Sequence, residues 1–181
     1  MIVGLTGHNA SGKGEVANYL VSKGYAYHSL SDVIREEARR RGLDCSRENL
    51  IDVGNDLRAR YGPSILARRI RERLTGKDVV DSIRNPYEVM ELRKEKSFFL
   101  VGVDSKLELR FKRSLQRGRI GDGVSLKEFQ DKEEKENSSN FLAQQLNECM
   151  KLADHIIFNN GTLEELHLKV NEFLTLLEKS S

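Results

Sequence analysis

The residues of this chain best suited to chemistry lie in a glycine-rich segment close to its beginning. Residues 7–13 read G-H-N-A-S-G-K and follow the apolar run Met1–Thr6, which has the character of a short strand. Glycine at positions 7 and 12 lets backbone N–H groups face an anion, because no Cβ stands in the way. The helix expected to begin at Lys13 adds its positive end, and the lysine adds a mobile cation. The pattern G-x-x-x-x-G-K favours a loop that holds the phosphates of a nucleotide, with an ordinary glycine-rich turn as the alternative.

The contacts expected from this loop extend slightly past the lysine. The next position is commonly Ser or Thr, whose hydroxyl ligates Mg²⁺, but this chain has Gly14. The sequence therefore offers no loop hydroxyl for the metal at this position, although Mg²⁺ itself is still expected. His8 is expected to point to solvent and to have no acid–base role. The expected nucleotide contacts are Gly7, Asn9, Ala10, Ser11, Gly12, Lys13, Gly14 and Glu15.

Length and composition narrow the class of protein. A chain of 181 residues is expected to form one α/β domain over residues 1–181. Its net charge of only +2 gives no bulk field that would attract nucleic acid or a membrane surface. No apolar run approaches membrane-spanning length, and the two cysteines suggest reduced thiols. We expect a cytoplasmic protein that acts on a small molecule without nucleic acid or membrane, and the sequence carries no marker of oligomeric state.

Apolar runs and helical periodicities alternate along the chain, which is typical of a parallel sheet built from βαβ units. The expected strands are Ile2–Thr6, Tyr25–Ser29, Asp78–Ser82, Phe98–Val103 and His155–Phe158. The expected helices are Lys13–Ser22, Asp32–Arg41, Arg47–Tyr61, Ser64–Leu74, Pro86–Lys94, Lys106–Arg117, Asn140–Leu152 and Leu163–Leu177. These elements predict an α/β protein of three layers, in which helices flank a five-stranded parallel sheet.

Two segments stand apart from the alternating pattern. Residues 32–74, between the second and third strands, form a helical insertion that could grip an acceptor substrate. Residues 118–140 contain Gly118, Gly121 and Gly123 and then a polar run without an apolar stripe. This second segment is either a solvated surface excursion or a mobile lid that closes over the nucleotide.

Four segments beyond the loop resemble motifs of one enzyme family. They are S-D-V-I-R at residues 31–35, V-V-D-S-I-R at 79–84, R-x-x-x-R at 113–117 and A-D-H-I-I-F-N-N-G-T at 153–162. With the loop, they make nearly the whole chain similar to the nucleoside monophosphate kinase and dephospho-CoA kinase branch of P-loop NTPases. The similarity extends to small archaeal kinase-like proteins and to the kinase-like domain fused to deoxycytidylate deaminases. It implies transfer of the γ-phosphoryl group of ATP to a nucleotide acceptor, with Mg²⁺ held largely through water.

The resemblance also implies roles on the acceptor side of the site. Arg35, in a helix start that contains Asp32, would grip the acceptor phosphate together with Arg84, although Ser31 stands where the family has glycine. Asp81 would end a strand beside the loop and orient the waters of Mg²⁺. Plainer alternatives are a solvated helical cation for Arg35 and a helix cap for Asp81.

A cluster of arginines is implied to neutralise the transferred phosphoryl group, while Lys13 reaches the β- and γ-phosphates. Arg113 and Arg117 are four residues apart, so they share one helix face, and Arg119 follows. Arginine outnumbers lysine by 17 to 13, and its planar head binds phosphate bidentately. A solvated helix end is the alternative. Beyond Arg119, segment 118–140 retains only the cations Lys127, Lys132 and Lys135.

The last motif is implied to contact the purine of ATP through backbone groups. Asn160, Gly161 and Thr162 would make these contacts, although Asn-Gly is also a good turn and helix entry. Two rival functions remain open. Transfer to a hydroxyl, as in dephospho-CoA kinase, would need a carboxylate base such as Asp32, but the D-A-D element of that enzyme is absent. A non-catalytic nucleotide sensor is the other.

Overall fold

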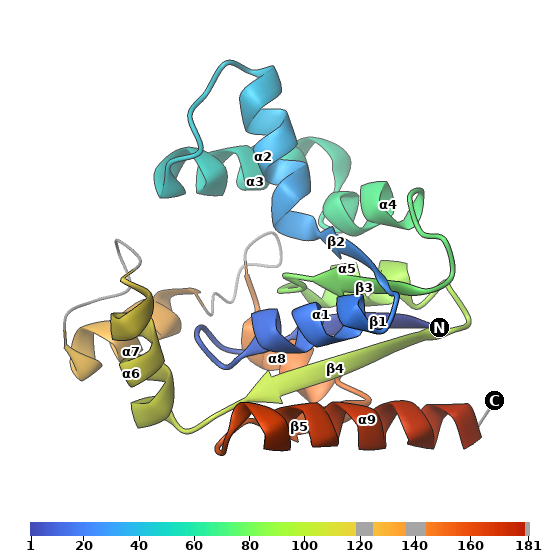
Figure 1. Ribbon diagram of the computed structural model, residues 1–181. Coiled ribbons are helices and arrows are strands. Elements are labelled where there is room, and N and C mark those ends of the chain that lie inside the picture. The colour runs from blue at the N-terminus through green and yellow to red at the C-terminus, as the bar shows by residue number, and fades with distance from the viewer. Residues whose placement is uncertain (119–124, 137–143, 180–181) are drawn as a thin grey trace.

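The computed structural model of the protein describes residues 1–118, 125–136 and 144–179. At its centre is a five-stranded parallel sheet with the strand order β2-β3-β1-β4-β5 (Figure 1). The strands are β1 (Ile2–Thr6), β2 (Ala26–Ser29), β3 (Asp78–Asp81), β4 (Phe98–Asp104) and β5 (His155–Phe158). The predicted α/β class and parallel sheet are confirmed, and each predicted strand agrees with the structure to within one residue at either end.

The centre of the sheet is apolar on both faces, as parallel strands require when helices cover them. Successive residues of β1 alternate between two buried clusters: Ile2 faces one, and Val3 and Leu5 face the other. Gly4 allows close packing, because a Cβ there would lie 2.5 Å from the ring of Phe98.

Helices complete a layer on each side of the sheet. One cluster is closed by α1 (Lys13–Ser22) and α9 (Leu163–Lys179), whose Leu20 and Val170 are buried in it. The other is closed by α5 (Pro86–Leu92) and α8 (Leu146–Lys151), through Val89 and Cys149 among others. In the described part of the chain no helix combines the length and apolar character needed to cross a bilayer.

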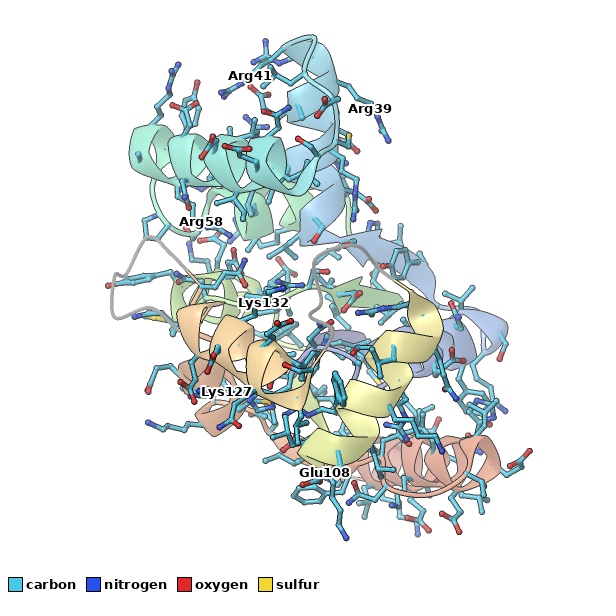
Figure 2. All side chains as sticks on the ribbon, turned by 90° about the vertical axis from the view of Figure 1, so that its left-hand side faces the viewer. Arg39, Arg41, Arg58, Glu108, Lys127 and Lys132 are labelled. Atoms are coloured by element: carbon cyan, nitrogen blue, oxygen red, sulfur yellow. The ribbon has the colours of Figure 1, made fainter. Side chains whose placement is uncertain are left out.

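The insertion between β2 and β3 forms its own block of helices. These are α2 (Leu30–Arg40), α3 (Arg47–Tyr61) and α4 (Ile65–Arg71), which stand above the β2 edge of the sheet in Figure 1. Figure 2 places Arg39 and Arg41 at the outer end of this block, and Arg58 on the side of α3 nearer the rest of the protein. There Arg58 Nη2 donates to Glu88 Oε1 of α5 at 3.1 Å, a buried ion pair that ties the block to the sheet domain.

The segment after α6 (Leu107–Arg117) differs from the prediction, because it contains an unpredicted helix, α7 (Leu126–Glu136). A single buried residue, Phe129, anchors α7: its ring lies 5.9 Å from that of Phe111 on α6. Because only one of the described side chains of α7 is buried, its sequence has no repeating apolar stripe, and the hydrophobic periodicity did not reveal the helix. The helix predicted from residue 140 was also too long, because α8 begins only at Leu146.

Candidate phosphate-binding site

The glycine-rich segment connects β1 to α1 at the carboxyl edge of the sheet, in a conformation that needs its two glycines. Gly7 has φ 141° and Gly12 has φ 106°, both in the region that side chains disfavour. A Cβ on Gly7 would lie 2.0 Å from the carbonyl oxygen of Val103, and one on Gly12 would lie 2.2 Å from Asn159 Nδ2. Ala10 also has positive φ, at 57°. The loop is therefore wound tightly against β4 and the end of β5.

Lys13 spans the mouth of this loop. Its Nζ donates to the carbonyl oxygen of Gly7 at 2.7 Å and to that of His8 at 2.8 Å. Burial lowers the pKa of Lys13 to about 8, and the neighbouring cation Arg84 contributes to the lowering, whereas Asp81 acts in the opposite direction. Arg110 and Arg117 add to the lowering. The loop thus lies in a cationic environment that an anion would stabilise.

Two buried oxygen atoms beside the loop have no hydrogen-bond partner among the described residues. They are Ser11 Oγ and Asp81 Oδ1. Asp81 ends β3, and its other oxygen, Oδ2, accepts a hydrogen bond from Tyr27 at 3.3 Å. Mg²⁺ usually keeps several waters and takes one or two carboxylates plus phosphate oxygens. A single unpaired carboxylate oxygen next to a phosphate loop fits that manner of binding, and the described residues contain no cluster of three or more metal-ligating side chains.

The arginines of α6 separate into two groups. Arg117 Nη2 donates to Asn9 Oδ1 of the loop at 2.9 Å. Arg113 faces the β4 and β5 ends instead, where it donates to Ser105 Oγ and to the carbonyl oxygen of Asn159, both at 3.1 Å. Burial lowers the pKa of Arg113. Arg119 lies outside the described residues.

Arg110 is a neighbour of the loop that the sequence motif did not reveal. It is buried, with 6% exposure, and its Nη1 donates to the carbonyl oxygen of Asn9 at 3.4 Å. The same nitrogen pairs with Glu133 of α7, and Nε donates to the carbonyl oxygen of Ser105 at 3.0 Å. The signal was present in the spacing, because Arg110 precedes Arg117 by two helical turns and so lies on the same face of α6.

Asn159 is a second residue that the sequence interpretation missed. It follows β5, is 7% exposed, and its Nδ2 donates to the carbonyl oxygen of Ser11 at 2.9 Å. It therefore holds the loop in shape from the far side. Asn159 belongs to the motif at residues 153–162, but the motif assigns base contacts only to the turn that follows it, at Asn160, Gly161 and Thr162.

Those neighbours make mostly local contacts. Asn160 Oδ1 accepts from the backbone N–H of Lys106 at 2.9 Å, which joins the end of β5 to the start of α6. Thr162 and Glu165 each accept from the other's backbone N–H, at 3.3 and 3.2 Å, and so begin α9. Gly161 fits below Glu165, because a Cβ at Gly161 would lie 1.5 Å from Oε2 of that residue.

On the acceptor side, Asp32 and Arg35 bind each other. Arg35 Nη1 donates to Asp32 Oδ1 at 2.6 Å within the first turns of α2. Arg84 is held from another direction: its Nη1 donates to Gln144 Oε1, and its backbone N–H donates to Glu88 Oε2, both at 3.0 Å. Both arginines thus have protein partners in this structure, and that of Arg35 is a carboxylate.

The expectation that His8 points to solvent was wrong, because its side chain has protein partners and is only 21% exposed. Its Nδ1 lies 3.1 Å from Asp104 Oδ1, and its Nε2 lies 3.4 Å from Asn147 Oδ1 of α8. The hydrogen bond from His8 lowers the pKa of Asp104. The sheet register explains the contact. Thr6 pairs with Gly102, so two residues further along, His8 just after β1 lies beside Asp104, the last residue of β4.

Comparison with known proteins agrees with this architecture. The sequence pattern of a family described as an AAA domain matches residues 6–130. TT1252 of Thermus thermophilus superposes with a TM-score of 0.62 at 25% identity, over 98% of this chain and 97% of that one. Shikimate kinase of Acinetobacter baumannii superposes with a TM-score of 0.61 over 99% and 94% of the chains, and its 14% identity shows the fold alone. The fold and the loop define a P-loop kinase-like protein.

Proteins of similar sequence identify the family of the chain more narrowly than the similar structures do. A UPF0200 protein of Pyrococcus horikoshii is 35% identical, and the match covers 97% of this chain and 96% of the relative. A UPF0200/UPF0201 protein of Archaeoglobus fulgidus is 34% identical over 99% of this chain but 56% of its own length. The chain belongs to the UPF0200 family.

Proposed function

We propose that the protein is an ATP- and Mg²⁺-dependent phosphotransferase, namely a nucleoside or deoxynucleoside monophosphate kinase. The observation that carries the proposal is the environment of Lys13. Its ammonium group closes the loop, and three arginines lower its pKa from other elements. Cations held this close together repel one another unless an anion of high charge lies between them. The triphosphate of ATP is such an anion, and the N–H groups of the loop suit its oxygens.

Each side chain then has a physical task in the transfer. Lys13 would bind the β- and γ-phosphates, and Arg117, with Asn9 beside it, would stabilise charge on the moving phosphoryl group. Arg113 would contribute to the same charge stabilisation after turning from Asn159, and Arg119 would extend the series. Asn160, Gly161 and Thr162 would contact the base, where they already join β5 to α6 and α9.

Mg²⁺, when bound, neutralises charge on the phosphate oxygens. The residues that would hold it are Asp81, through Oδ1 and water molecules, and Ser11, through a hydroxyl that has no partner in the part of the chain that the structure describes. No ligation by Gly14 is required, which agrees with the absence of a side chain at that position.

The acceptor would bind between the α2–α4 insertion and the loop. Its phosphate would replace Asp32 as the partner of Arg35 and would be shared with Arg84. An acceptor phosphate is already ionised near neutral pH, so its oxygen can attack the γ-phosphorus in line, form the new P–O bond and release ADP without a general base. Segment 118–140 would act as a lid that excludes water. We propose no nucleic-acid or membrane partner, and a cytoplasmic location.

A hydroxyl acceptor is the second candidate, and Asp32 is the observation that favours it. Its carboxylate is 49% exposed on the acceptor side, where it is able to accept a proton from an alcohol. The two candidates differ in pH dependence, because only the hydroxyl reaction requires that carboxylate as a base.

The decisive experiment is a turnover screen with ATP·Mg²⁺ against all ribo- and deoxyribonucleoside monophosphates, with dephospho-CoA and shikimate as hydroxyl acceptors. We expect ADP formation with one or a few monophosphates, and a loss on the order of 10³-fold or more in Lys13→Ala. Turnover with only an alcohol would support the second candidate. Tight ATP binding without transfer to any acceptor would overturn the proposal in favour of a nucleotide sensor.

A further inference from the structure

A largely buried ion pair joins helix α7 to helix α6 beside the phosphate loop. Figures 1 and 2 both show α7 beside α6, and Figure 2 marks α7 by Lys127 and Lys132 and the start of α6 by Glu108. Arg110 of α6 pairs with Glu133 of α7, and the two side chains are only 8% and 13% exposed. The guanidinium carbon of Arg110 also lies 5.7 Å from the ring centroid of Phe129, so the head group is covered on more than one side.

The same guanidinium reaches the loop at the residue that Arg117 also contacts. Arg110 donates to the main-chain oxygen of Asn9, and Arg117 donates to the side-chain oxygen of Asn9. Both arginines are also close enough to Lys13 to lower its pKa. Two guanidinium groups therefore meet at Asn9 of the loop, and that of Arg110 is paired with a carboxylate from α7.

A pocket of about 210 Å³ opens next to this ion pair. It is lined by His8, Leu107, Arg110, Gln130, Glu133, Glu134 and Asn147. The pocket therefore leaves open space directly beside the Arg110 head group. The pocket is lined by His8 of the loop and by residues of α7, so a movement of Arg110 would change contacts both with the loop and with α7.

We propose that Arg110 is an additional phosphate-binding residue, and that Glu133 occupies it until a triphosphate displaces the carboxylate and releases the second half of α7. A buried charge is costly when it loses its partner, so Arg110 can leave Glu133 only for another anion. A triphosphate carries more charge than one carboxylate and accepts the planar guanidinium bidentately. Glu133 thus weakens nucleotide binding and couples it to α7. The inference rests on the proposed nucleotide binding.

The test is calorimetric titration of ATP·Mg²⁺ into the wild type and a set of matched variants. Glu133→Gln keeps the shape of the side chain but removes its charge, and we expect it to bind ATP about tenfold more tightly. Glu134→Gln, the neighbour on α7 that lines the same pocket, is the matched control and should bind like the wild type. Arg110→Met should bind about tenfold more weakly, and adding Glu133→Gln to it should give no gain.

Equal affinities of the wild type and Glu133→Gln would overturn the inference while leaving nucleotide binding in place. Absence of ATP binding by the wild type would overturn the proposed function and the inference together. Hydrogen exchange on the unmodified protein supplies a measurement that needs no variant to fold. On addition of ATP·Mg²⁺, amides of residues 130–136 should exchange faster while those of α1 exchange more slowly, and unchanged exchange at 130–136 would contradict the release of α7.

Discussion

The depressed pKa of Lys13 predicts that the residue most needed for phosphate binding weakens the free protein. We consider Lys13→Met, which keeps an unbranched side chain only one atom shorter but removes the charge. In the folded protein the pKa is about 8, against 10.5 for the unperturbed group. Between these two values the unfolded chain binds more protons than the folded one, so the free energy of unfolding of the wild type rises with pH. Below a pH of about 8, Lys13 is charged in both the folded and the unfolded chain, and the cost of burying its charge then lowers the free energy of unfolding by the greatest amount.

The magnitude follows from the two pKa values. A difference of one pKa unit corresponds to about 1.4 kcal/mol. At about pH 7 the charged Lys13 therefore lowers the free energy of unfolding by an amount on the order of 3 kcal/mol. Raising the pH from about 7 to about 9.5 removes about 2 kcal/mol of this destabilisation. The hydrogen bonds of Lys13 Nζ to the carbonyl oxygens of Gly7 and His8 offset part of this destabilisation, by about 1 kcal/mol each. That offset lowers the absolute gain from Lys13→Met without removing the pH trend.

Urea unfolding of both proteins without nucleotide, at intervals from about pH 7 to about pH 9.5, measures the difference directly. We expect Lys13→Met to be more stable than the wild type near pH 7, by about 1 kcal/mol after the lost hydrogen bonds are counted. This advantage should shrink and then reverse as the pH rises. Other titrating groups are common to both proteins and cancel in the difference. A difference that stays flat with pH would show that the Lys13 ammonium is not destabilised by its surroundings, and would remove the basis of the proposed site.

Three further substitutions test other parts of the structure. Gly7→Ala should abolish ATP binding and lower the melting temperature, because its Cβ would lie 2.0 Å from a carbonyl oxygen of β4. The control Gly14→Ala, with nothing within 4 Å of its Cβ, should melt like the wild type. Equal melting temperatures of the two variants would contradict this prediction. Arg35→Ala should raise the KM for the acceptor far more than the KM for ATP in steady-state kinetics, and equal effects would argue against its assignment. Arg58→Met removes the ion-pair partner of the buried Glu88 carboxylate, which keeps only backbone N–H donors within the described structure, and should cost about 3 kcal/mol in urea unfolding. Adding Glu88→Gln should recover part of that loss, and a neutral Arg58→Met would refute it.

The fold was predictable because its signals are local. Each strand is a short apolar run, and each βα unit repeats the same alternation, so hydrophobic pattern alone indicated the parallel sheet. Helix α7 was not predicted because it is held by tertiary contacts with α6, namely Phe129 against Phe111 and Glu133 against Arg110, and such contacts leave no hydrophobic periodicity in the sequence.

The site was predictable only where a motif marks it. Gly7, Gly12 and Lys13 lie, as predicted, where β1 passes into α1, because that turn is specified by neighbouring residues in the sequence. His8 was misjudged because its partner, Asp104, is brought beside it only by the register of β1 with β4. Sequence separation hides such contacts, and a known sheet register could have revealed this one.

Charge balance around the loop connects these observations. Around Lys13 the structure gathers Arg84, Arg110 and Arg117, together with Asp81 and, through Arg110, Glu133. Arg84, Arg110 and Arg117 each lower the pKa of Lys13, so the Lys13 ammonium group is under repulsion in the free protein. A monovalent anion would relieve part of it, whereas a triphosphate would relieve it and also free Glu133. If this balance governs binding, affinity should rise steeply from phosphate to diphosphate to tripolyphosphate, with a larger final step in the wild type than in Glu133→Gln.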